Sequence, residues 1–341
     1  MMAEAARTTG AERDLWVRMY RLMVLSRALD HRMWILNRQG KSAFVISGQG
    51  QEGLQAGAVF ALDPAVDWLA PYYRDMTLVL GFGMTPREVM LGQLAKAADP
   101  SSGGRQMPAH WGHRARRILT GSSPVTTQVT HAAGLALAFR VRHERAAVLS
   151  TLGEGSTNQG EFHEALNFAA VHRLPLIVLV QNNGYSISVP QSKEMAVADV
   201  AARAAGYGIP GVVVRGSDPV AVYEAVRAAR ERALAGDGPT LIEAKTHRYT
   251  PHSSDDDDRS YRTPEELRAQ KQDDPITLFR EVLAAQGLWD DEAEARLLQE
   301  VKLVVDDATD YAEKAPYPDP ATLWLHVYGS DDAPAAGAGR D

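Results

Sequence analysis

The sequence predicts an α/β fold: a mostly parallel sheet with helices on both faces, and extra helices at the N- and C-terminal ends. Two observations predict it. Short strands that are apolar throughout, such as residues 176–180, recur in the middle of the chain. Strands of this kind are typical of parallel sheets that are buried on both faces. Segments with helical periodicity separate them, as the crossovers between parallel strands require.

The N-terminal region is predicted to be helical. Apolar residues recur on one face of residues 13–38, which predicts a long amphipathic helix. A second helix is expected over residues 49–62. Thr85 is a suitable N-cap and Pro86 a suitable first helical residue, so a third helix is expected to begin there.

From residue 128 onward, helices and strands are expected to alternate. The expected order is helix 128–143, strand 146–151, helix 160–172, strand 176–180, a helix near 195–206, strand 212–214, helix 219–235 and strand 240–244. Three further helices, over 264–273, 275–286 and 291–314, are expected to close the chain. The alternation predicts a single α/β domain.

Domain boundaries follow from composition. Residues 13–329 are expected to form the domain, while residues 1–12 and 330–341 are polar or small-residue tails that we expect to be disordered. Residues 246–262 (THRYTPHSSDDDDRSYR) are too charged to pack into a core. They are predicted to form a mobile functional loop or a disordered one.

Composition excludes several classes of protein. The net charge of −7 argues against nucleic acid as the main partner. The chain has no cysteine, which excludes disulfides, thiolate nucleophiles and cysteine-ligated metals. We find no apolar run long enough to span a bilayer and no signal or transit peptide, so we expect no membrane partner and a cytoplasmic location.

Polar motifs follow two of the expected strands. One strand runs into Gly153-Glu154-Gly155-Ser156 and the next into Asn182-Asn183-Gly184-Tyr185. Ligands of parallel sheets bind beyond the carboxyl ends of the strands, where a carboxylate, an amide oxygen and a backbone carbonyl would meet. Such oxygens suit Mg²⁺, which completes its coordination with phosphate and water. Glycines and a helix N-terminus would let a diphosphate approach.

Each of these motifs, taken alone, is also compatible with a purely structural role. The two glycines could simply turn the chain, and the asparagines could cap a strand. A dinucleotide-binding loop is disfavoured, because Asn158 stands where the G-x-G-x-x-G pattern needs its third glycine.

Taken together, the motifs resemble a known one. The sequence G-E-G at 153–155, followed after 26 residues by Asn182-Asn183, resembles the thiamine diphosphate motif, which usually reads G-D-G and ends in N-N. Glutamate in place of aspartate also occurs in branched-chain members. From about residue 20 to residue 261, segments such as GRQMPAHWG, SSPVTTQ and GEGSTNQGEFHEALNFA look like the α subunits of branched-chain 2-oxo acid dehydrogenases. The resemblance implies the thiamine-diphosphate-binding fold.

The resemblance also implies a set of cofactor ligands. Glu154, Asn183 and the backbone carbonyl of Tyr185 would bind Mg²⁺. The diphosphate would contact the remaining residues of this set, which are Tyr73, Arg74, Gly153, Gly155 and Ser156. The planar guanidinium of Arg74 is well suited to phosphate. Some relatives place an arginine where this chain has Gln181, so one cationic contact is either missing or supplied elsewhere.

Two more segments gain a role from the resemblance. Ser123 and Val125 would lie beside the aminopyrimidine ring, with His110 as a further neighbour. In some members the equivalents of Ser122, Pro124, Thr127 and Gln128 hold a potassium ion, although turn chemistry alone also explains Ser122, Ser123 and Pro124.

His252 would approach the diphosphate and assist acyl transfer to lipoate. Its ordinary pKa is near neutral, which suits proton movement at physiological pH. Ser253 matches a serine that is phosphorylated in animal relatives.

The implied reaction is the oxidative decarboxylation of a branched 2-oxo acid, such as 3-methyl-2-oxobutanoate, with thiamine diphosphate and Mg²⁺. Tyr72, Tyr73 and Val125 would line the substrate pocket. A separate β subunit would supply the glutamate that activates the cofactor, giving an α2β2 assembly. The acyl group would pass to a lipoyl-bearing acyltransferase.

Three alternatives remain open. Within the class, the chain could be the α subunit of a pyruvate or acetoin dehydrogenase. Outside it, the chain could be a nicotinamide dehydrogenase, which would bind NADH directly and without thiamine diphosphate. It could also be a non-catalytic assembly module with the thiamine fold, although the complete set Arg74, Glu154, Asn183 and His252 argues against this.

Overall fold

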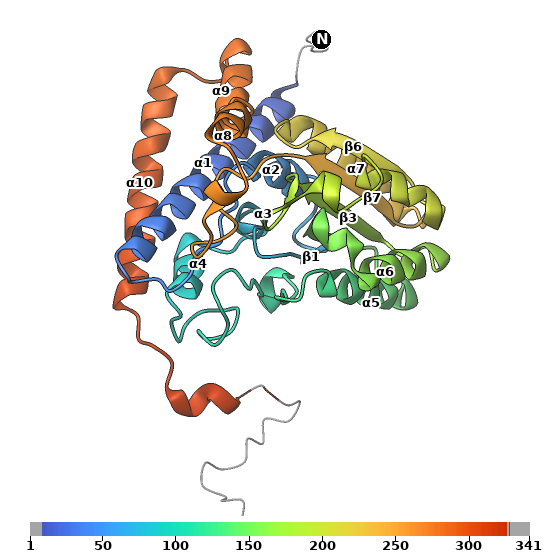
Figure 1. Ribbon diagram of the computed structural model, residues 1–341, viewed down its shortest axis with the longest axis horizontal. Helices are drawn as coiled ribbons and strands as arrows, with labels where there is room; N and C mark the ends of the chain where they lie inside the picture. Colours follow the sequence, from blue (N-terminus) through green and yellow to red (C-terminus); the bar gives the residue numbers. More distant parts are fainter. Residues whose placement is uncertain (1–8, 326, 328–341) are drawn as a thin grey trace, which may run out of the picture.

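The computed structural model describes residues 9–325 and 327, and its centre is a five-stranded parallel sheet (Figure 1). The strands lie in the order β1-β2-β3-β7-β6. Their bounds are β1 (Trp68–Ala70), β2 (Val148–Gly153), β3 (Leu176–Asn182), β6 (Gly211–Arg215) and β7 (Thr240–Lys245), and a short antiparallel hairpin consists of β4 (Tyr185–Ser186) and β5 (Val189–Pro190). The predicted parallel sheet is confirmed.

Helices surround this sheet. The α-helices are α1 (Gly10–Arg38), α2 (Glu52–Phe60), α3 (Met76–Gly81), α4 (Pro86–Gln93), α5 (Thr127–Arg142), α6 (Gly160–Val171), α7 (Pro219–Leu234), α8 (Pro264–Lys271), α9 (Pro275–Ala285) and α10 (Asp291–Lys314). The short 3-10 helices are η1 (Arg114–Arg116), η2 (Gly155–Asn158), η3 (Gln191–Lys193), η4 (Val200–Tyr207), η5 (Asp258–Ser260) and η6 (Pro320–Trp324). None of the helices in the described part of the chain is both long and apolar enough to cross a membrane.

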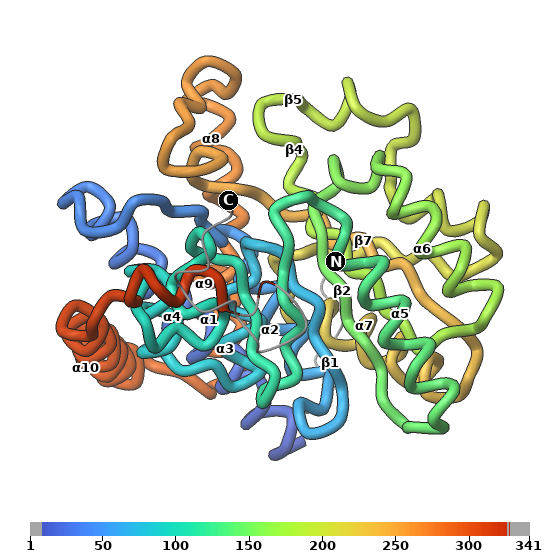
Figure 2. The backbone as a smooth tube through the Cα atoms, turned by 90° about the horizontal axis from the view of Figure 1, so that it is seen from below, coloured from blue at the N-terminus to red at the C-terminus, as the bar shows by residue number. Residues whose placement is uncertain are grey.

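The sheet separates two hydrophobic cores. Side chains alternate across it, so Ile177 and Leu179 of β3 point into one core while Val178 and Val180 point into the other. Helices α5 and α6 cover the second core, whereas α2, α7 and the N- and C-terminal helices build the first, larger one (Figures 1 and 2). Burial on both faces explains why β3 is apolar along most of its length.

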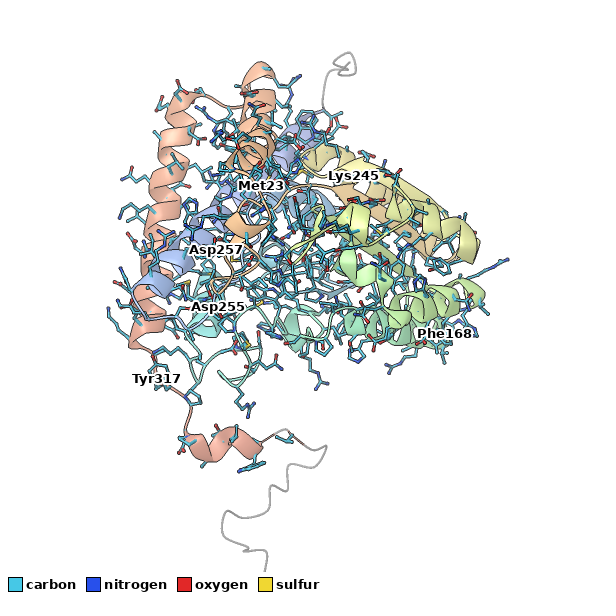
Figure 3. All side chains as sticks on the ribbon, viewed as in Figure 1. Met23, Phe168, Lys245, Asp255, Asp257 and Tyr317 are labelled. Carbon is cyan, nitrogen blue, oxygen red and sulfur yellow. The ribbon has the colours of Figure 1, made fainter. Side chains whose placement is uncertain are left out.

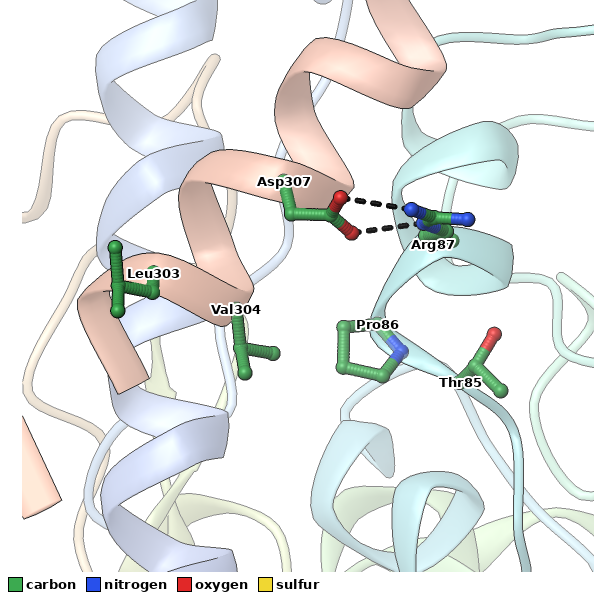
Figure 4. A pocket seen from close by; sticks show the side chains of 6 residues that line it. All are labelled: Thr85, Pro86, Arg87, Leu303, Val304 and Asp307. Atoms are coloured by element: carbon green, nitrogen blue, oxygen red, sulfur yellow. Dashed lines mark hydrogen bonds and ion pairs between the residues drawn. The ribbon is translucent and has the colours of Figure 1, made fainter. Parts of the chain in front are cut away.

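The terminal helices pack together at one end of the molecule. Helix α10 lies along α1 and also contacts α4 (Figure 1). Thr85 and Glu88 form a capping box at the start of α4, with Pro86 at the beginning of the helix, as the sequence predicts. The next residue, Arg87, makes two hydrogen bonds of 2.7 Å to Asp307 of α10, beside a surface hollow lined by Val304 (Figure 4).

Several boundaries differ from the prediction. Helix α1 begins at Gly10, because Thr9 and Glu12 form a capping box there, so residues 10–12 belong to the helix and not to a tail. Residues 1–8 of the predicted N-terminal tail, and the predicted tail 330–341, lie outside the described residues. The helix expected near 195–206 is a 3-10 helix over Val200–Tyr207. Strand β1 was not predicted, since three residues are too few to show a pattern.

The expectation that residues 246–262 are too charged to pack is wrong. Arg248 is 1% exposed and Arg262 is 4% exposed. Arg262 pairs with Asp258 and donates to the carbonyl of Thr250 at 2.8 Å, so partners within the loop satisfy this buried charge. The loop leaves β7 at Lys245 and runs through Asp255 and Asp257 toward α8 (Figure 3).

Candidate functional site

Four strand ends bring the predicted site residues to one edge of the sheet. Arg74 follows β1, Glu154 follows β2, Asn183 follows β3 and His252 lies in the loop after β7. These strands are neighbours and all parallel, so their carboxyl ends share one edge.

Glu154 and Asn183 meet because β2 and β3 pair in register, with Gly153 opposite Gln181. The backbone N–H of Asn183 donates to Oε2 of Glu154 at 3.1 Å. The other oxygen of Glu154, Oε1, and the amide oxygen of Asn183, Oδ1, are buried and have no hydrogen-bond partner within the described residues. Buried polar atoms without a partner are costly, so two unpaired oxygens at adjacent strand ends indicate a binding site for a cation.

Electrostatics supports this interpretation. Glu154 is 1% exposed, and burial raises its pKa to about 7, with the nearby Glu194 carboxylate contributing in the same direction. A cation would favour the ionised carboxylate and offset that burial. The described residues contain no cluster of three His, Asp or Glu side chains that could hold a metal. One carboxylate with amide and carbonyl oxygens instead matches a hard cation that keeps other ligands, as Mg²⁺ does.

The glycines of the motif differ in what surrounds them. A Cβ added at Gly153 would meet no atom within 4 Å, so its surroundings are open. A Cβ at Gly155 would lie 2.4 Å from Oγ of Ser186, so Gly155 lets η2 pack against the β4–β5 hairpin. Ser156 is buried, and its backbone carbonyl accepts a 2.9 Å hydrogen bond from the hydroxyl of Thr126.

Tyr73, Arg74 and His252 lie together in the site, and Arg74 supplies the positive charge of this group. Arg74 is 2% exposed, and its guanidinium donates to the carbonyls of Ser47 at 2.7 Å and His252 at 3.0 Å. It also lies 5.2 Å from the ring centre of Tyr73, and the rings of Tyr73 and His252 meet edge to face at 6.2 Å.

The pKa of His252 differs from the near-neutral value that the sequence suggests. Burial, followed by the charges of Arg74 and Arg248, lowers its pKa to about 4, so the ring is neutral at physiological pH and does not titrate near pH 7. A guanidinium can only donate, and Nη2 of Arg74 lies 3.1 Å from Nδ1 of His252. Nδ1 is therefore the acceptor, and the ring proton sits on Nε2.

Both polar groups of the Gln181 side chain make hydrogen bonds to other side chains. It is fully buried, donates to the carboxylate of Asp75, and accepts a 3.0 Å hydrogen bond from Gln55. Burial raises the pKa of Asp75 to about 7.

Arg248 brings a second guanidinium near Arg74, and burial together with this like charge lowers the pKa of Arg248 to about 10.

The segment at residues 122–128 has one strained residue and one free acceptor. Thr126 is buried with φ of 88°, a conformation that costs energy for a β-branched residue and often marks a functional site. The Nε2 group of Gln128 donates to the carbonyl of Thr151 at 2.8 Å, but its Oε1 is buried without a partner. Ser123, which is exposed, hydrogen-bonds to Nε2 of His110.

Comparison with known proteins decides the family. The model of the dehydrogenase E1 component family matches residues 20–321. The chain belongs to the dehydrogenase E1 component family. It is 56% identical to the 2-oxoisovalerate dehydrogenase subunit alpha of Bacillus subtilis, over 92% of this chain and 94% of that one. It is 37% identical to the human mitochondrial 2-oxoisovalerate dehydrogenase subunit alpha, over 92% of this chain and 70% of the human one.

A pyruvate-specific relative is also similar. The pyruvate dehydrogenase E1 component subunit alpha of Bacillus cereus is 39% identical over 87% of this chain and 77% of its own length. Membership of the E1 family decides against the nicotinamide dehydrogenase alternative. It confirms the resemblance that the sequence motifs suggest, and the α/β fold agrees with it.

Sequence reasoning missed several residues of this candidate site. Asp75 follows Arg74 directly, but its burial against β2 and β3 cannot be read from the chain. Arg248 lies in a loop that looked too polar to pack. Glu194 comes after the Asn-Asn motif, in a segment with no pattern of its own. The burial of these charged side chains has no sequence signal, because it depends on how separate segments pack in the folded chain.

Proposed function

We propose that the chain is the α subunit of a thiamine-diphosphate-dependent dehydrogenase that acts on branched 2-oxo acids. The observation that carries the proposal is the pair of unpartnered buried oxygens, Glu154 Oε1 and Asn183 Oδ1, at adjacent strand ends. The similarity to 2-oxoisovalerate dehydrogenase α subunits supports the substrate class.

The donor set fits the cofactor's metal. Glu154, Asn183 and the carbonyl of Tyr185 would hold Mg²⁺, which would offset the negative charge of the diphosphate. Gln128 Oε1, with Thr127, Ser122 and Pro124, would hold K⁺, and the free acceptor on Gln128 supports that site. Ser123 and Val125 would lie beside the aminopyrimidine ring.

The remaining residues bind and orient. Arg74 and Tyr73 would contact the diphosphate next to the open backbone at Gly153. His252 would donate through Nε2–H to an anionic oxygen, because its other ring nitrogen is held by Arg74. The cofactor, when bound, supplies the electron sink for decarboxylation.

A β subunit of the same component and a lipoyl-bearing acyltransferase are the proposed partners, in an α2β2 assembly. The glutamate that activates the cofactor would come from the β subunit. The cytoplasmic location expected from the sequence stays a prediction.

The substrate test compares two acids on the assembly of this chain with its β subunit. Burying two extra carbons is worth about 1.6 kcal/mol, at roughly 0.8 kcal/mol per methylene, which corresponds to around 15-fold. We expect kcat/KM for 3-methyl-2-oxobutanoate to exceed that for pyruvate by about this factor, without excluding pyruvate. The assay uses an artificial electron acceptor. A ratio of one or less would favour a pyruvate dehydrogenase. This is the second candidate function, because the chain is also similar to the Bacillus cereus pyruvate dehydrogenase subunit.

A further inference from the structure

Glu194 lies beside the candidate metal site, and the proposed function gives it no role. It follows η3, just after the β4–β5 hairpin. One of its carboxylate oxygens, Oε1, accepts a 3.0 Å hydrogen bond from the backbone N–H of Ser186. The other, Oε2, is buried and has no partner within the described residues.

The free oxygen of Glu194 lies against the metal-binding turn. A Cβ built on Gly155 would stand 3.2 Å from Oε2 of Glu194, and Gly155 is the residue directly after Glu154. The negative charge of Glu194 acts on Glu154. Three unpaired buried oxygens, on Glu154, Asn183 and Glu194, therefore gather in this region.

The hydrogen bond to Ser186 also acts on a metal ligand. The N–H of Ser186 and the carbonyl of Tyr185 belong to the same peptide group, and the described residues contain no cis peptide bond. In a planar trans peptide these two groups point in opposite directions, so an acceptor on the N–H fixes the direction of the carbonyl. Pro190, which pairs with Tyr185 across the hairpin, has no N–H to offer that carbonyl.

We propose that Glu194 is a second carboxylate of the metal site and acts as a positioning residue: Oε1 holds the Tyr185–Ser186 peptide so that the Tyr185 carbonyl is available as a ligand, and Oε2 accepts a hydrogen bond from a metal-bound water. This inference rests on the proposed function, since it concerns the same cation. A carboxylate bound to a water on a cation is a charge-assisted acceptor, which is stronger than a neutral one.

Two variants distinguish a role of Glu194 in metal binding from a role only in the folding of the β4–β5 hairpin. Glu194→Gln keeps the size of the side chain and an oxygen for the Ser186 N–H, but removes the negative charge. Glu194→Ala removes both the negative charge and the oxygen that accepts from the Ser186 N–H. Glu164→Gln makes the same change of charge on an exposed residue of α6 and serves as the matched control.

The experiment measures Mn²⁺ binding by electron paramagnetic resonance on the assembly with its β subunit, in the presence of thiamine diphosphate. We expect about tenfold weaker Mn²⁺ binding in Glu194→Gln and a larger loss in Glu194→Ala, with Glu164→Gln unchanged. The melting temperature of metal-free Glu194→Gln should equal that of the unsubstituted assembly.

Each outcome has a distinct meaning. If the unsubstituted assembly binds no Mn²⁺, the proposed function itself fails. If it binds Mn²⁺ and Glu194→Gln binds equally well, the carboxylate has no part in the metal site and the inference is overturned. A loss of affinity matched by a fall in metal-free melting temperature in Glu194→Gln would also overturn it, because Glu194 would then only support the fold.

Discussion

His252 and Arg74 share a hydrogen bond that fixes which ring nitrogen is free. Because Arg74 occupies Nδ1, only Nε2–H can face a ligand. The same guanidinium, with burial, lowers the pKa of His252 to about 4. A neutral donor keeps its contact to diphosphate unchanged near pH 7, whereas a donor that titrates in this range would change its contact with pH.

This low pKa predicts acid sensitivity. The pKa of His252 is lower in the folded state than the usual 6.5. Above pH 6.5 the ring is neutral in both states, but between 6.5 and 4 only the unfolded chain gains a proton, so folded stability falls as pH falls. Between pH 7.5 and 5.5, the melting temperature of the assembly should fall less in His252→Gln than in the unsubstituted protein. His131→Gln, on an exposed residue, is the control. Equal falls in all three proteins would contradict the account.

At the scale of elements, the sequence predicts the sheet well and its irregular parts poorly. The apolar run of β3 and the caps of α4 are local features, so they appear in the chain itself. The pairing of Glu154 with Asn183 also follows, because adjacent parallel strands align their ends. The packed loop at 246–262 does not follow, because no local pattern shows that Arg248 reaches Tyr261 within the loop and Ile187 in the β4–β5 hairpin.

The loop after β7 should resist proteolysis even without cofactor. Arg248 donates at 2.9 Å both to the carbonyl of Ile187 and to the hydroxyl of Tyr261, so it joins the loop to the β4–β5 hairpin. Loss of the Arg248 side chain would remove both part-buried hydrogen bonds and the link to the hairpin. With a protease that cleaves after acidic residues, Arg248→Ala should speed cutting within residues 255–258 at least tenfold.

Arg259→Ala is the matched control for that experiment. The side chain of Arg259 is 86% exposed and pairs with Asp257, so its removal should change the cutting rate little. Rapid cutting of the unsubstituted loop, or equal rates in both variants, would show that Arg248 does not hold the loop in place.

At the scale of the whole molecule, two cores hold the strands while the ligands stand at the carboxyl edge of the sheet. The rigid sheet fixes the distances between the strand ends, and the loops that follow the strands carry the candidate functional side chains. By the proposal, this chain supplies metal ligands, cationic donors and an apolar wall to the site. The glutamate that would activate the cofactor belongs, by the proposal, to the β subunit.

The isolated chain should therefore release no carbon dioxide from any 2-oxo acid, even with thiamine diphosphate and Mg²⁺ present. Adding the β subunit should restore activity. The assay follows carbon dioxide release from preparations whose composition is checked by mass spectrometry. Robust release without a β subunit would mean that this chain holds a complete site.

The most direct test of the account is calorimetry of thiamine diphosphate binding to the assembly of this chain with its β subunit. Glu154→Ala removes the carboxylate whose free oxygen marks the metal site, and EDTA removes the metal. Both should abolish most of the binding heat, whereas Glu164→Gln should leave it unchanged. Unchanged affinity for thiamine diphosphate in both Glu154→Ala and EDTA would contradict a magnesium-dependent cofactor site at these strand ends.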